Sequence, residues 1–320
     1  MYKSDVEAAD AFVSKYKELS TEIAKVIIGQ DEVVKDVLIS IFSKGHCLLI
    51  GVPGLAKTLL VNTIADVLGL SYNRIQFTPD LMPSDIIGSE ILGDDRHFKF
   101  IKGPLFANIV LADEINRTPP KTQAALLEAM QERSITTGGK RYELGNPFFV
   151  LATQNPIEQE GTYPLPEAQL DRFMFNVWLD YPKLEDEFLV VKNTTSSKKV
   201  ELKKVLSAEE ILYFQELVRR IPIADNVLEY AVKLASKTRP NTEHAAEIAS
   251  KYLSWGAGPR ASQFLVIGAK CHALIKGKYS PDIEDVKAVA TAILRHRIVR
   301  NYKAEAEGVS VDKIILELMK

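Results

Sequence analysis

The segment Gly51–Thr58, which reads Gly-Val-Pro-Gly-Leu-Ala-Lys-Thr, most constrains the fold of this 320-residue chain. It follows the apolar run His46–Ile50 and opens the amphipathic stretch Thr58–Leu68, so a glycine-rich loop is expected between a strand and a helix. Such a loop curls its backbone N–H groups around an anion at the positive end of a helix. The spacing therefore predicts a phosphate-binding loop in an α/β protein.

Each position of this loop has an expected part in binding a nucleotide. Lys57 is placed to reach the outer phosphates, and the hydroxyl of Thr58 is placed to ligate Mg²⁺. The remaining loop positions of the predicted binding set are Gly51, Val52, Pro53, Gly54, Leu55, Ala56 and Leu59. Ala56 stands where a second glycine is usual, and its Cβ is expected to require an ordinary helical backbone. The alternative interpretation is a glycine turn with an exposed lysine.

A second apolar run ends in two carboxylates. Asn108–Ala112 is followed by Asp113 and Glu114, which predicts a strand buried on both faces with an acidic pair at its carboxyl end. Ligands bind at that end of an open parallel sheet. Asp113 is therefore expected to hold Mg²⁺ together with Thr58, and Glu114 to orient and deprotonate the attacking water. A solvated pair that caps the next helix is the alternative.

Further polar side chains lie where elements begin or end. The run Phe148–Thr153 leads to Asn155, which a neighbouring parallel strand would bring to the γ-phosphate or the water, although Asn-Pro is also an ordinary turn dipeptide. Arg172 precedes the apolar stretch Phe173–Leu179, and Arg260 lies in the first turn of a late helix after a proline. Each arginine alone is typical of a surface ion pair.

Taken in order, five motifs resemble those of the AAA+ ATPases, and more closely those of the MoxR family. They are GVPGLAKT from Gly51, LADEINR from Leu111, ATQNP from Ala152, LPEAQLDRF from Leu165 and GPRAS from Gly258. They span nearly the whole chain, and an alanine in the loop is typical of MoxR-like sequences. The resemblance implies that Asn155 senses the γ-phosphate, that Arg172 is an arginine finger presented to a neighbouring subunit, and that Arg260 is the second sensor from the lid. It also implies that Ile28 and Gly29 lie beside the adenine.

Two segments are similar to insertions that MoxR proteins share with magnesium chelatases. Phe77–Gly88 is similar to the helix-two insertion, although its proline, aspartate and glycine residues also suit a plain loop. Glu132–Leu144 contains a Gly-Gly pair and is similar to the hairpin before the sensor strand. In related rings such insertions face the central pore or a partner. Lys140 and Arg141 near the hairpin turn are more typical of simple solvation than of a grip on nucleic acid.

The breaks in the pattern divide the chain into two domains. Apolar positions at helical spacing in Asp5–Val26 predict a leading helix, and strands alternate with helices from there to Leu179. Residues 1–183 are therefore expected to form a core of the AAA+ type, a parallel sheet sandwiched between helices. Asn193–Lys204 is polar and is expected to be a mobile connection. Residues 184–320 are expected to form an all-helical lid domain.

Two helix starts are predicted within the lid. Ser207 and Glu210 form a capping-box pattern, and Ser280-Pro281 is expected to start a further helix. The basic run Arg295–Arg300 ends that helix, where cations complement the backbone dipole. In the core, Arg117 follows the acidic pair closely enough to reach either the nucleotide or a subunit boundary.

Composition limits the partners and the compartment. The chain has 40 lysine and arginine residues against 42 aspartate and glutamate residues, so it has no bulk attraction for nucleic acid or anionic lipid. The N-terminus lacks an apolar signal core, and no stretch is long and apolar enough to span a bilayer. Cys47 and Cys271 suit small core positions in a reducing compartment. A cytoplasmic protein is therefore expected.

The sequence thus predicts Mg²⁺-dependent hydrolysis of ATP to ADP and phosphate. A homo-oligomer, expected to be a hexameric ring, follows from the part of Arg172 in trans. The family implies chaperone-like maturation of protein complexes, often with partners that carry von Willebrand A domains. The alternatives are a nucleic-acid motor of the helicase type, a metal-chelatase ATPase subunit and a non-enzymatic nucleotide-gated adaptor. A GTPase is disfavoured because no Asn-Lys-x-Asp motif is present.

Overall fold

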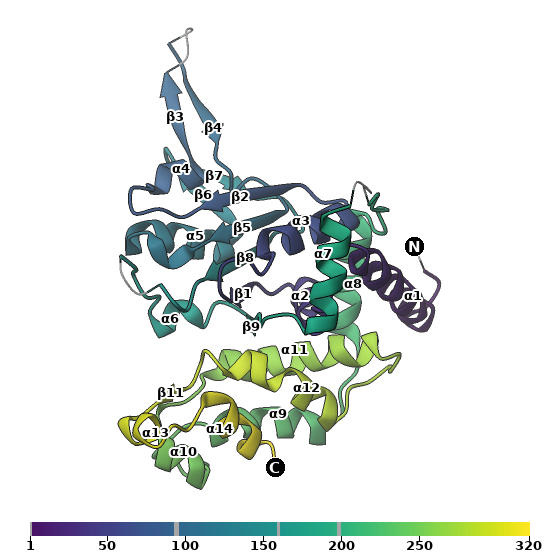
Figure 1. Ribbon diagram of the computed structural model, residues 1–320, viewed down its shortest axis with the longest axis vertical. Coiled ribbons are helices and arrows are strands. Elements are labelled where there is room, and N and C mark those ends of the chain that lie inside the picture. Colours follow the sequence, from purple (N-terminus) through teal and green to yellow (C-terminus); the bar gives the residue numbers. More distant parts are fainter. Residues whose placement is uncertain (1, 93–95, 159–160, 197–199) are drawn as a thin grey trace.

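The computed structural model describes residues 2–92, 96–158, 161–196 and 200–320. Figure 1 shows a parallel sheet with helices on both sides in the upper part of the molecule and a mainly helical part below it. The predicted fold class, a helix-sandwiched parallel sheet followed by a helical lid, is confirmed.

The central sheet has five strands, and their order places the predicted site strands side by side. The order is β2 (Tyr72–Gln76), β5 (Ile109–Asp113), β8 (Phe149–Gln154), β1 (Cys47–Ile50) and β9 (Phe175–Trp178). All neighbours are parallel. Leu49 and Leu111 face one buried cluster, whereas Leu48 and Val110 face the other. Because both faces are covered, these strands are continuous apolar runs in the sequence.

Helices cover both faces of the central sheet. One cluster includes side chains of α1 (Asp5–Ala24), α2 (Asp31–Phe42) and α3 (Lys57–Leu68), and the other includes those of α5 (Pro120–Glu132). Two short elements, η1 (Ile115–Arg117) and α6 (Glu167–Leu170), lie in the connections. The leading helix agrees with its prediction, and Ser4 caps it by accepting a hydrogen bond from the Glu7 amide.

Both predicted insertions contain regular structure. The first is not a plain loop: it holds α4 (Pro83–Ile87) and continues into a hairpin of β3 (Gly88–Leu92) and β4 (Phe98–Lys102), which projects from the sheet in Figure 1. The second is the predicted hairpin, with β6 (Ser134–Thr137) and β7 (Lys140–Glu143). Phe100 stacks on Tyr142 with ring centroids 4.3 Å apart, so the two hairpins support each other.

Residues 184–320, the predicted lid, are mainly helical but not wholly so. The elements in this range are α7 (Leu184–Thr194), α8 (Ala208–Arg220), α9 (Asp225–Lys237), α10 (Glu247–Tyr252), β10 (Leu253–Trp255), α11 (Pro259–Ile275), α12 (Ile283–Leu294), β11 (Val299–Arg300), α13 (Tyr302–Ala306) and α14 (Val311–Leu318). The antiparallel pair of β10 and β11 corrects the all-helical prediction. The capping box of Ser207 and Glu210 is confirmed. Helix α12 starts later than predicted, because Asp282 rather than Ser280 caps it.

The polar connection between the two parts is partly fixed to the core. Its first residues belong to α7, and residues 197–199 lie outside the described residues. The Lys203 amide donates to Glu22 at 3.0 Å, and the Val205 amide donates to the Val67 carbonyl at 2.8 Å. The end of the connection is therefore anchored rather than free, contrary to the prediction. The domain border at residue 183 falls directly before α7 and stays a prediction.

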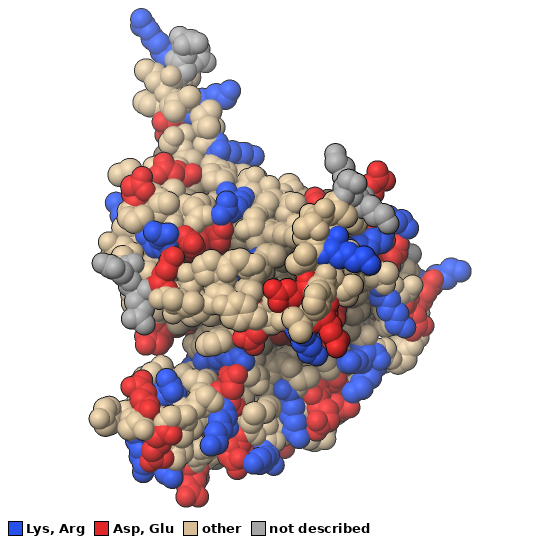
Figure 2. All heavy atoms as spheres, viewed as in Figure 1, with Lys and Arg blue, Asp and Glu red and all other residues tan. Residues whose placement is uncertain are grey.

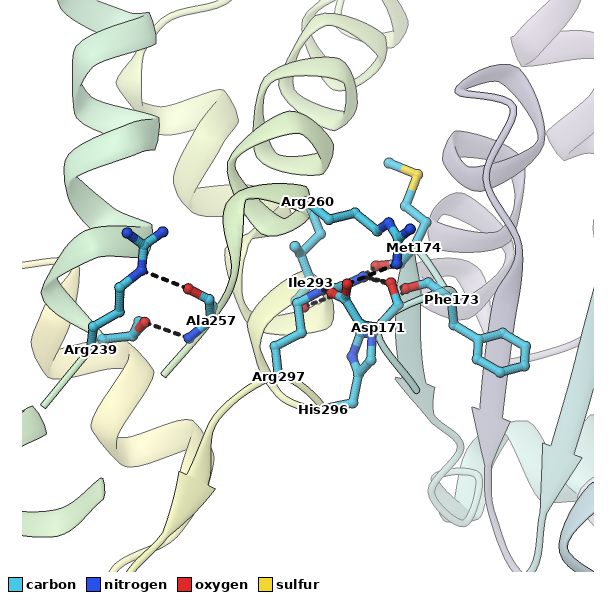
Figure 3. Close-up of polar contacts among 10 residues, drawn as sticks. Asp171, Phe173, Met174, Arg239, Ala257, Arg260, Ile293, His296 and Arg297 are labelled. Carbon is cyan, nitrogen blue, oxygen red and sulfur yellow. Dashed lines mark hydrogen bonds and ion pairs between the residues drawn. The ribbon is translucent and has the colours of Figure 1, made fainter. Parts of the chain in front are cut away.

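A buried arginine joins the lid to the core. Arg297 is 6% exposed, and its Nε donates to Asp171 Oδ1 at 2.8 Å. Its Nη atoms also donate to main-chain carbonyls that include those of Met174 and Ile293, as Figure 3 shows. A buried guanidinium needs such complete pairing, because an unpaired buried charge is costly. Helix α12 ends at Leu294, so the Arg295–Arg300 run lies at the helix C-terminus, as predicted. Arg297 bonds the Ile293 carbonyl in the last turn of that helix and adds tertiary contacts to the core that the dipole interpretation did not include.

The surface carries no dominant charge on the face that Figure 2 shows, where basic and acidic side chains are interspersed. Cys47 and Cys271 are both buried, as predicted. Among the described residues, none of the helices combines the length and the apolar character that crossing a membrane requires.

His46 fixes the start of β1 to its surroundings. It is buried, its Nε2 lies 3.1 Å from the Met130 carbonyl, and the Val150 amide donates to its Nδ1 at 3.0 Å. Nδ1 can accept and Nε2 can donate only in the neutral ring. Burial is the main cause that lowers the pKa of His46 to about 4, and the charge of Arg133 acts in the same direction.

We expect His46 to make the protein sensitive to acid. Its pKa is depressed on folding, so the unfolded chain takes up a proton below its ordinary value of 6.5, whereas the folded chain resists this until about pH 4. The free energy of unfolding should therefore fall by up to about 3 kcal/mol across this window. Urea unfolding of the parent and of His46→Gln at pH 7 and pH 4.5 measures this. The two proteins should converge in stability at the lower pH, and a constant difference would contradict the assignment.

Candidate nucleotide-binding site

The loop and the acidic pair meet at one cavity of about 430 Å³ at the carboxyl edge of the sheet. Ten predicted site residues line it: Pro53, Gly54, Leu55, Ala56, Lys57, Thr58, Leu59, Asp113, Glu114 and Asn155. They come from the loop between β1 and α3, from the first turn of α3, and from the ends of β5 and β8. This is the edge where parallel strands present ligand-binding groups.

The loop adopts two left-handed backbone positions. Gly54 has φ 89°, and Ala56 has φ 55° and ψ 26° directly before α3. The prediction of a helical backbone at Ala56 is therefore wrong. The residue is the N-cap of α3, where a positive φ turns the chain from the loop into the helix, at a cost for an L-residue of about 1–2 kcal/mol. Strain of this kind is typical of ligand-binding loops.

Lys57 points back across its own loop. Its Nζ donates to the carbonyl of Gly51 and, at 3.3 Å, to that of Val52. Burial lowers the pKa of Lys57, while Asp113 and Glu114 oppose that effect. A lysine held this way has its charge over the cavity, where phosphate oxygens would replace the two carbonyls as acceptors. Gly51 and Val52 are not among the described residues that line the cavity, so their contact with a nucleotide stays a prediction.

Asp113 is held on both of its oxygens. Oδ1 accepts a hydrogen bond from the Thr153 hydroxyl at 2.6 Å, and Oδ2 accepts from Arg74 Nη2 at 2.7 Å. Arg74, Asp113 and Thr153 lie on the adjacent strands β2, β5 and β8. Sequence reasoning missed both partners, because only the strand order β2-β5-β8 brings them to Asp113.

Glu114 is positioned by its backbone and by two donors. It has φ 57°, and its amide donates to Thr153 Oγ1 at 2.9 Å. Its Oε2 accepts from Gln76 Nε2 at 2.7 Å and from Arg117 Nη1 at 3.2 Å. Arg117 thus pairs with the predicted base. A contact with the nucleotide or with a subunit boundary, the two possibilities that the sequence left open for it, stays a prediction. The role of Gln76 had no sequence signal, since it depends on the pairing of β2 with β5.

Asn155 lines the same cavity as the acidic pair, at the edge of the sheet where the sequence placed it. It is buried, and its Oδ1 accepts from the Ile157 amide at 3.1 Å. This bond uses the carbonyl of the side chain, which leaves the amide NH₂ group as a donor for a phosphate oxygen or a water.

The predicted adenine segment lies against α7. Gly29 has φ 72°, and a Cβ there would come within 2.6 Å of the Asp186 carboxylate. The neighbouring Gln30 donates to the Leu55 carbonyl at 3.3 Å, which ties this segment to the phosphate loop. Neither Ile28 nor Gly29 is among the described residues that line the cavity, so their contact with adenine stays a prediction.

Arg172 and Arg260 lie together at a different place. Both line a small cavity with His46, Met130 and Gln131, and neither lines the cavity at the loop. Arg172 Nη1 donates to the Leu127 carbonyl at 2.6 Å, and Arg260 Nη1 donates to Asp171 Oδ2 at 2.8 Å. Figure 3 shows Arg260 directed at Asp171 beside the buried Arg297. Their roles as finger and sensor stay predictions.

The side chains around the cavity suit a hard cation held jointly with phosphates. Thr58 and Asp113 line the same cavity and offer a hydroxyl and a carboxylate, the oxygen ligands that Mg²⁺ takes. Within the residues that the structure describes, no group of three or more His, Cys, Asp and Glu side chains is arranged to hold a metal. A metal here would take the rest of its coordination from nucleotide oxygens and water.

Fold and site together define a P-loop ATPase. Residues 46–175 match the model of the ATPase family associated with various cellular activities (AAA), and residues 245–318 match an AAA lid domain. A candidate ATPase of known structure from Cytophaga hutchinsonii is 44% identical, with a TM-score of 0.91 over 98% of this chain and 96% of the other.

Named relatives give the narrower family. Chaperone MoxR1 of Mycobacterium tuberculosis is 42% identical over 93% of this chain and 79% of its own length. YeaC of Bacillus subtilis, an uncharacterised protein, is 41% identical over 93% and 91% of the two chains. Protein MoxR of Methylorubrum extorquens is 31% identical over 90% of each. The chain belongs to the MoxR family of AAA+ ATPases.

Proposed function

We propose that this ATPase is a Mg²⁺-dependent ring enzyme that uses ATP hydrolysis to remodel a protein partner in the cytoplasm. The observation that carries the proposal is the division of the charged groups between two places. The loop, Asp113, Glu114 and Asn155 surround one cavity, whereas Arg172 and Arg260 gather at another.

Each side chain at the loop cavity has a distinct part in the proposed reaction. Loop amides and Lys57 neutralise the phosphates, and Thr58 and Asp113 hold the metal, which screens the charge of the phosphate oxygens. Glu114 takes the proton of the attacking water, and Asn155 donates to the γ-phosphate or to that water. Gln76 and Arg117 fix the direction of the Glu114 carboxylate.

The second cavity supports assembly. Phosphoryl transfer is accelerated by an arginine that adds its charge to that of the lysine and the metal, and neither Arg172 nor Arg260 lines the loop cavity of its own chain. Closed rings present a head-to-tail interface, so one subunit's arginines would face the next subunit's nucleotide. A hexamer is the proposed ring.

The proposed client is a protein. One relative carries the name chaperone, which supports a protein substrate. The projecting hairpin β3–β4 exposes the apolar side chains Leu92 and Phe98, which suit contact with a polypeptide. A client with a von Willebrand A domain is the proposal that the family favours.

Assembly should make hydrolysis depend on protein concentration. If the arginines act in trans, phosphate release per subunit with Mg²⁺ and saturating ATP should rise by about tenfold or more from dilute to concentrated protein. Sedimentation of the same samples should show the larger species appearing over the same range. A dilute monomer that hydrolyses ATP as fast per subunit as concentrated protein would overturn the ring proposal, and absence of hydrolysis throughout would leave a nucleotide-gated adaptor.

A further inference from the structure

Arg74 on β2 hydrogen-bonds to Asp113, the carboxylate proposed to hold the metal. Its Nε and Nη2 lie 3.0 Å and 2.7 Å from the same oxygen, Oδ2 of Asp113. The other oxygen, Oδ1, accepts the Thr153 hydroxyl at 2.6 Å. A carboxylate offers about four lone-pair positions, and these three hydrogen bonds leave about one of them for a metal or its water.

The pair is arranged with the arginine on the solvent side. The Asp113 side chain is 11% exposed, whereas that of Arg74 is 46% exposed, and β2 is an edge strand of the sheet. Arg74 can therefore move away from Asp113 into water without unpacking the core. Its Nη2 also contacts Gln76, whose amide holds Glu114, so β2 contacts both members of the acidic pair.

We propose that Arg74 is a built-in counter-ion of Asp113 that keeps the nucleotide-free site poor at binding a divalent cation, so that the metal enters with the nucleotide phosphates. The inference rests on the proposed function in one respect, since it takes Asp113 as a metal ligand. It adds a residue that controls when the metal binds.

The electrostatic argument is direct. Without nucleotide, the protein offers a metal the neutral Thr58 hydroxyl and the Asp113 carboxylate, whose charge Arg74 already balances. Glu114, the other carboxylate that lines the cavity, is paired with Arg117 at 3.2 Å. Phosphates bring several negative charges to the loop, so with nucleotide the cation is attracted despite Arg74. Removing the Arg74 charge should raise the affinity of the nucleotide-free protein for a free divalent cation by about tenfold, a value that allows for screening of a half-exposed pair.

The test measures metal binding rather than turnover. Free Mn²⁺, a hard cation with preferences similar to Mg²⁺, is titrated by electron paramagnetic resonance into the nucleotide-free full chain. Arg74→Gln removes the charge, and Arg74→Lys keeps it. We expect about tenfold tighter Mn²⁺ binding for Arg74→Gln, and binding within about twofold of the parent for Arg74→Lys. Arg141→Gln, which removes an exposed arginine paired with Glu143 on β7, is the matched control and should leave binding unchanged.

Three outcomes overturn the proposal. Mn²⁺ affinity that is equal in the parent and Arg74→Gln, including no detectable binding by either, shows that Arg74 does not oppose the metal. Equal gains in Arg74→Gln and Arg74→Lys show an effect of shape rather than charge. Tight binding that persists when Asp113→Asn is added to Arg74→Gln shows another site. Because these titrations contain no ATP, failure here is distinct from failure of the proposed hydrolysis, which the unmodified chain tests.

Discussion

Arg172→Ala should hydrolyse ATP about 10³-fold more slowly than the parent, the lower end of the effect of an arginine finger. The Arg172 side chain does not line the cavity at the phosphate loop of its own subunit. Its guanidinium instead donates a hydrogen bond to the Leu127 carbonyl. Its loss should therefore leave ATP binding to the isolated chain nearly unchanged while turnover in the assembled protein collapses. Phosphate release and the binding of a fluorescent ATP analogue, both at high protein concentration, measure the two quantities.

A mixing experiment separates action in trans from a local role. Arg172→Ala keeps an intact Glu114, and Glu114→Gln keeps an intact Arg172, so some interfaces in mixed rings contain both groups. Mixing the two inactive variants should restore part of the activity, whereas mixing either with more of itself should not. Arg141→Ala is a control that removes an exposed arginine elsewhere and should retain the parent rate within about twofold. Failure of the mixture to recover any activity, with assembly intact, would count against Arg172 as the shared group.

Local patterns predicted the parts of the site that depend on one segment of chain. The run Cys47–Ile50, the loop after it and the start of α3 form one continuous stretch, so turn chemistry and helix dipole specify them together. The same holds for the strand that ends at Asp113 and for the Gly-Gly hairpin. Asn155 was found because a second buried strand had to end at the same edge of the sheet.

Contacts across the sheet and between the domains could not be predicted in this way. Arg74 and Gln76 lie 39 and 38 residues before the carboxylates that they hold, in a short strand with no apolar run. The sequence placed Arg297 at the end of a helix but gave no sign of its partner Asp171, which is 126 residues away. Ala56 shows a different limit, since its left-handed backbone is imposed by the loop against the preference of the residue itself.

Glu114→Gln should lower the rate of ATP hydrolysis by at least about 10²-fold and leave ATP binding intact. The amide of glutamine has the shape of the carboxylate but cannot take a proton from water. Gln76 can still donate to its oxygen, so the geometry at the end of β5 should persist. Lys57 and the loop amides, which are expected to carry most of the phosphate binding, are unaffected. Phosphate release and equilibrium binding of ATP with Mg²⁺ measure the two effects.

Glu158→Gln is the matched control for charge, because Glu158 is an exposed carboxylate 4.0 Å from Arg117 that does not line the cavity. Its charge acts on Lys57, as that of Glu114 does, but it lies outside the cavity where water would be activated. It should hydrolyse ATP within about twofold of the parent, as expected for the loss of one exposed charge that does not line the cavity. If Glu114→Gln kept more than about a tenth of the parent rate, the general base would lie elsewhere. If both glutamate variants lost activity equally, the charge around Arg117 rather than proton transfer by Glu114 would limit the reaction, and Arg117 would become the residue to test next.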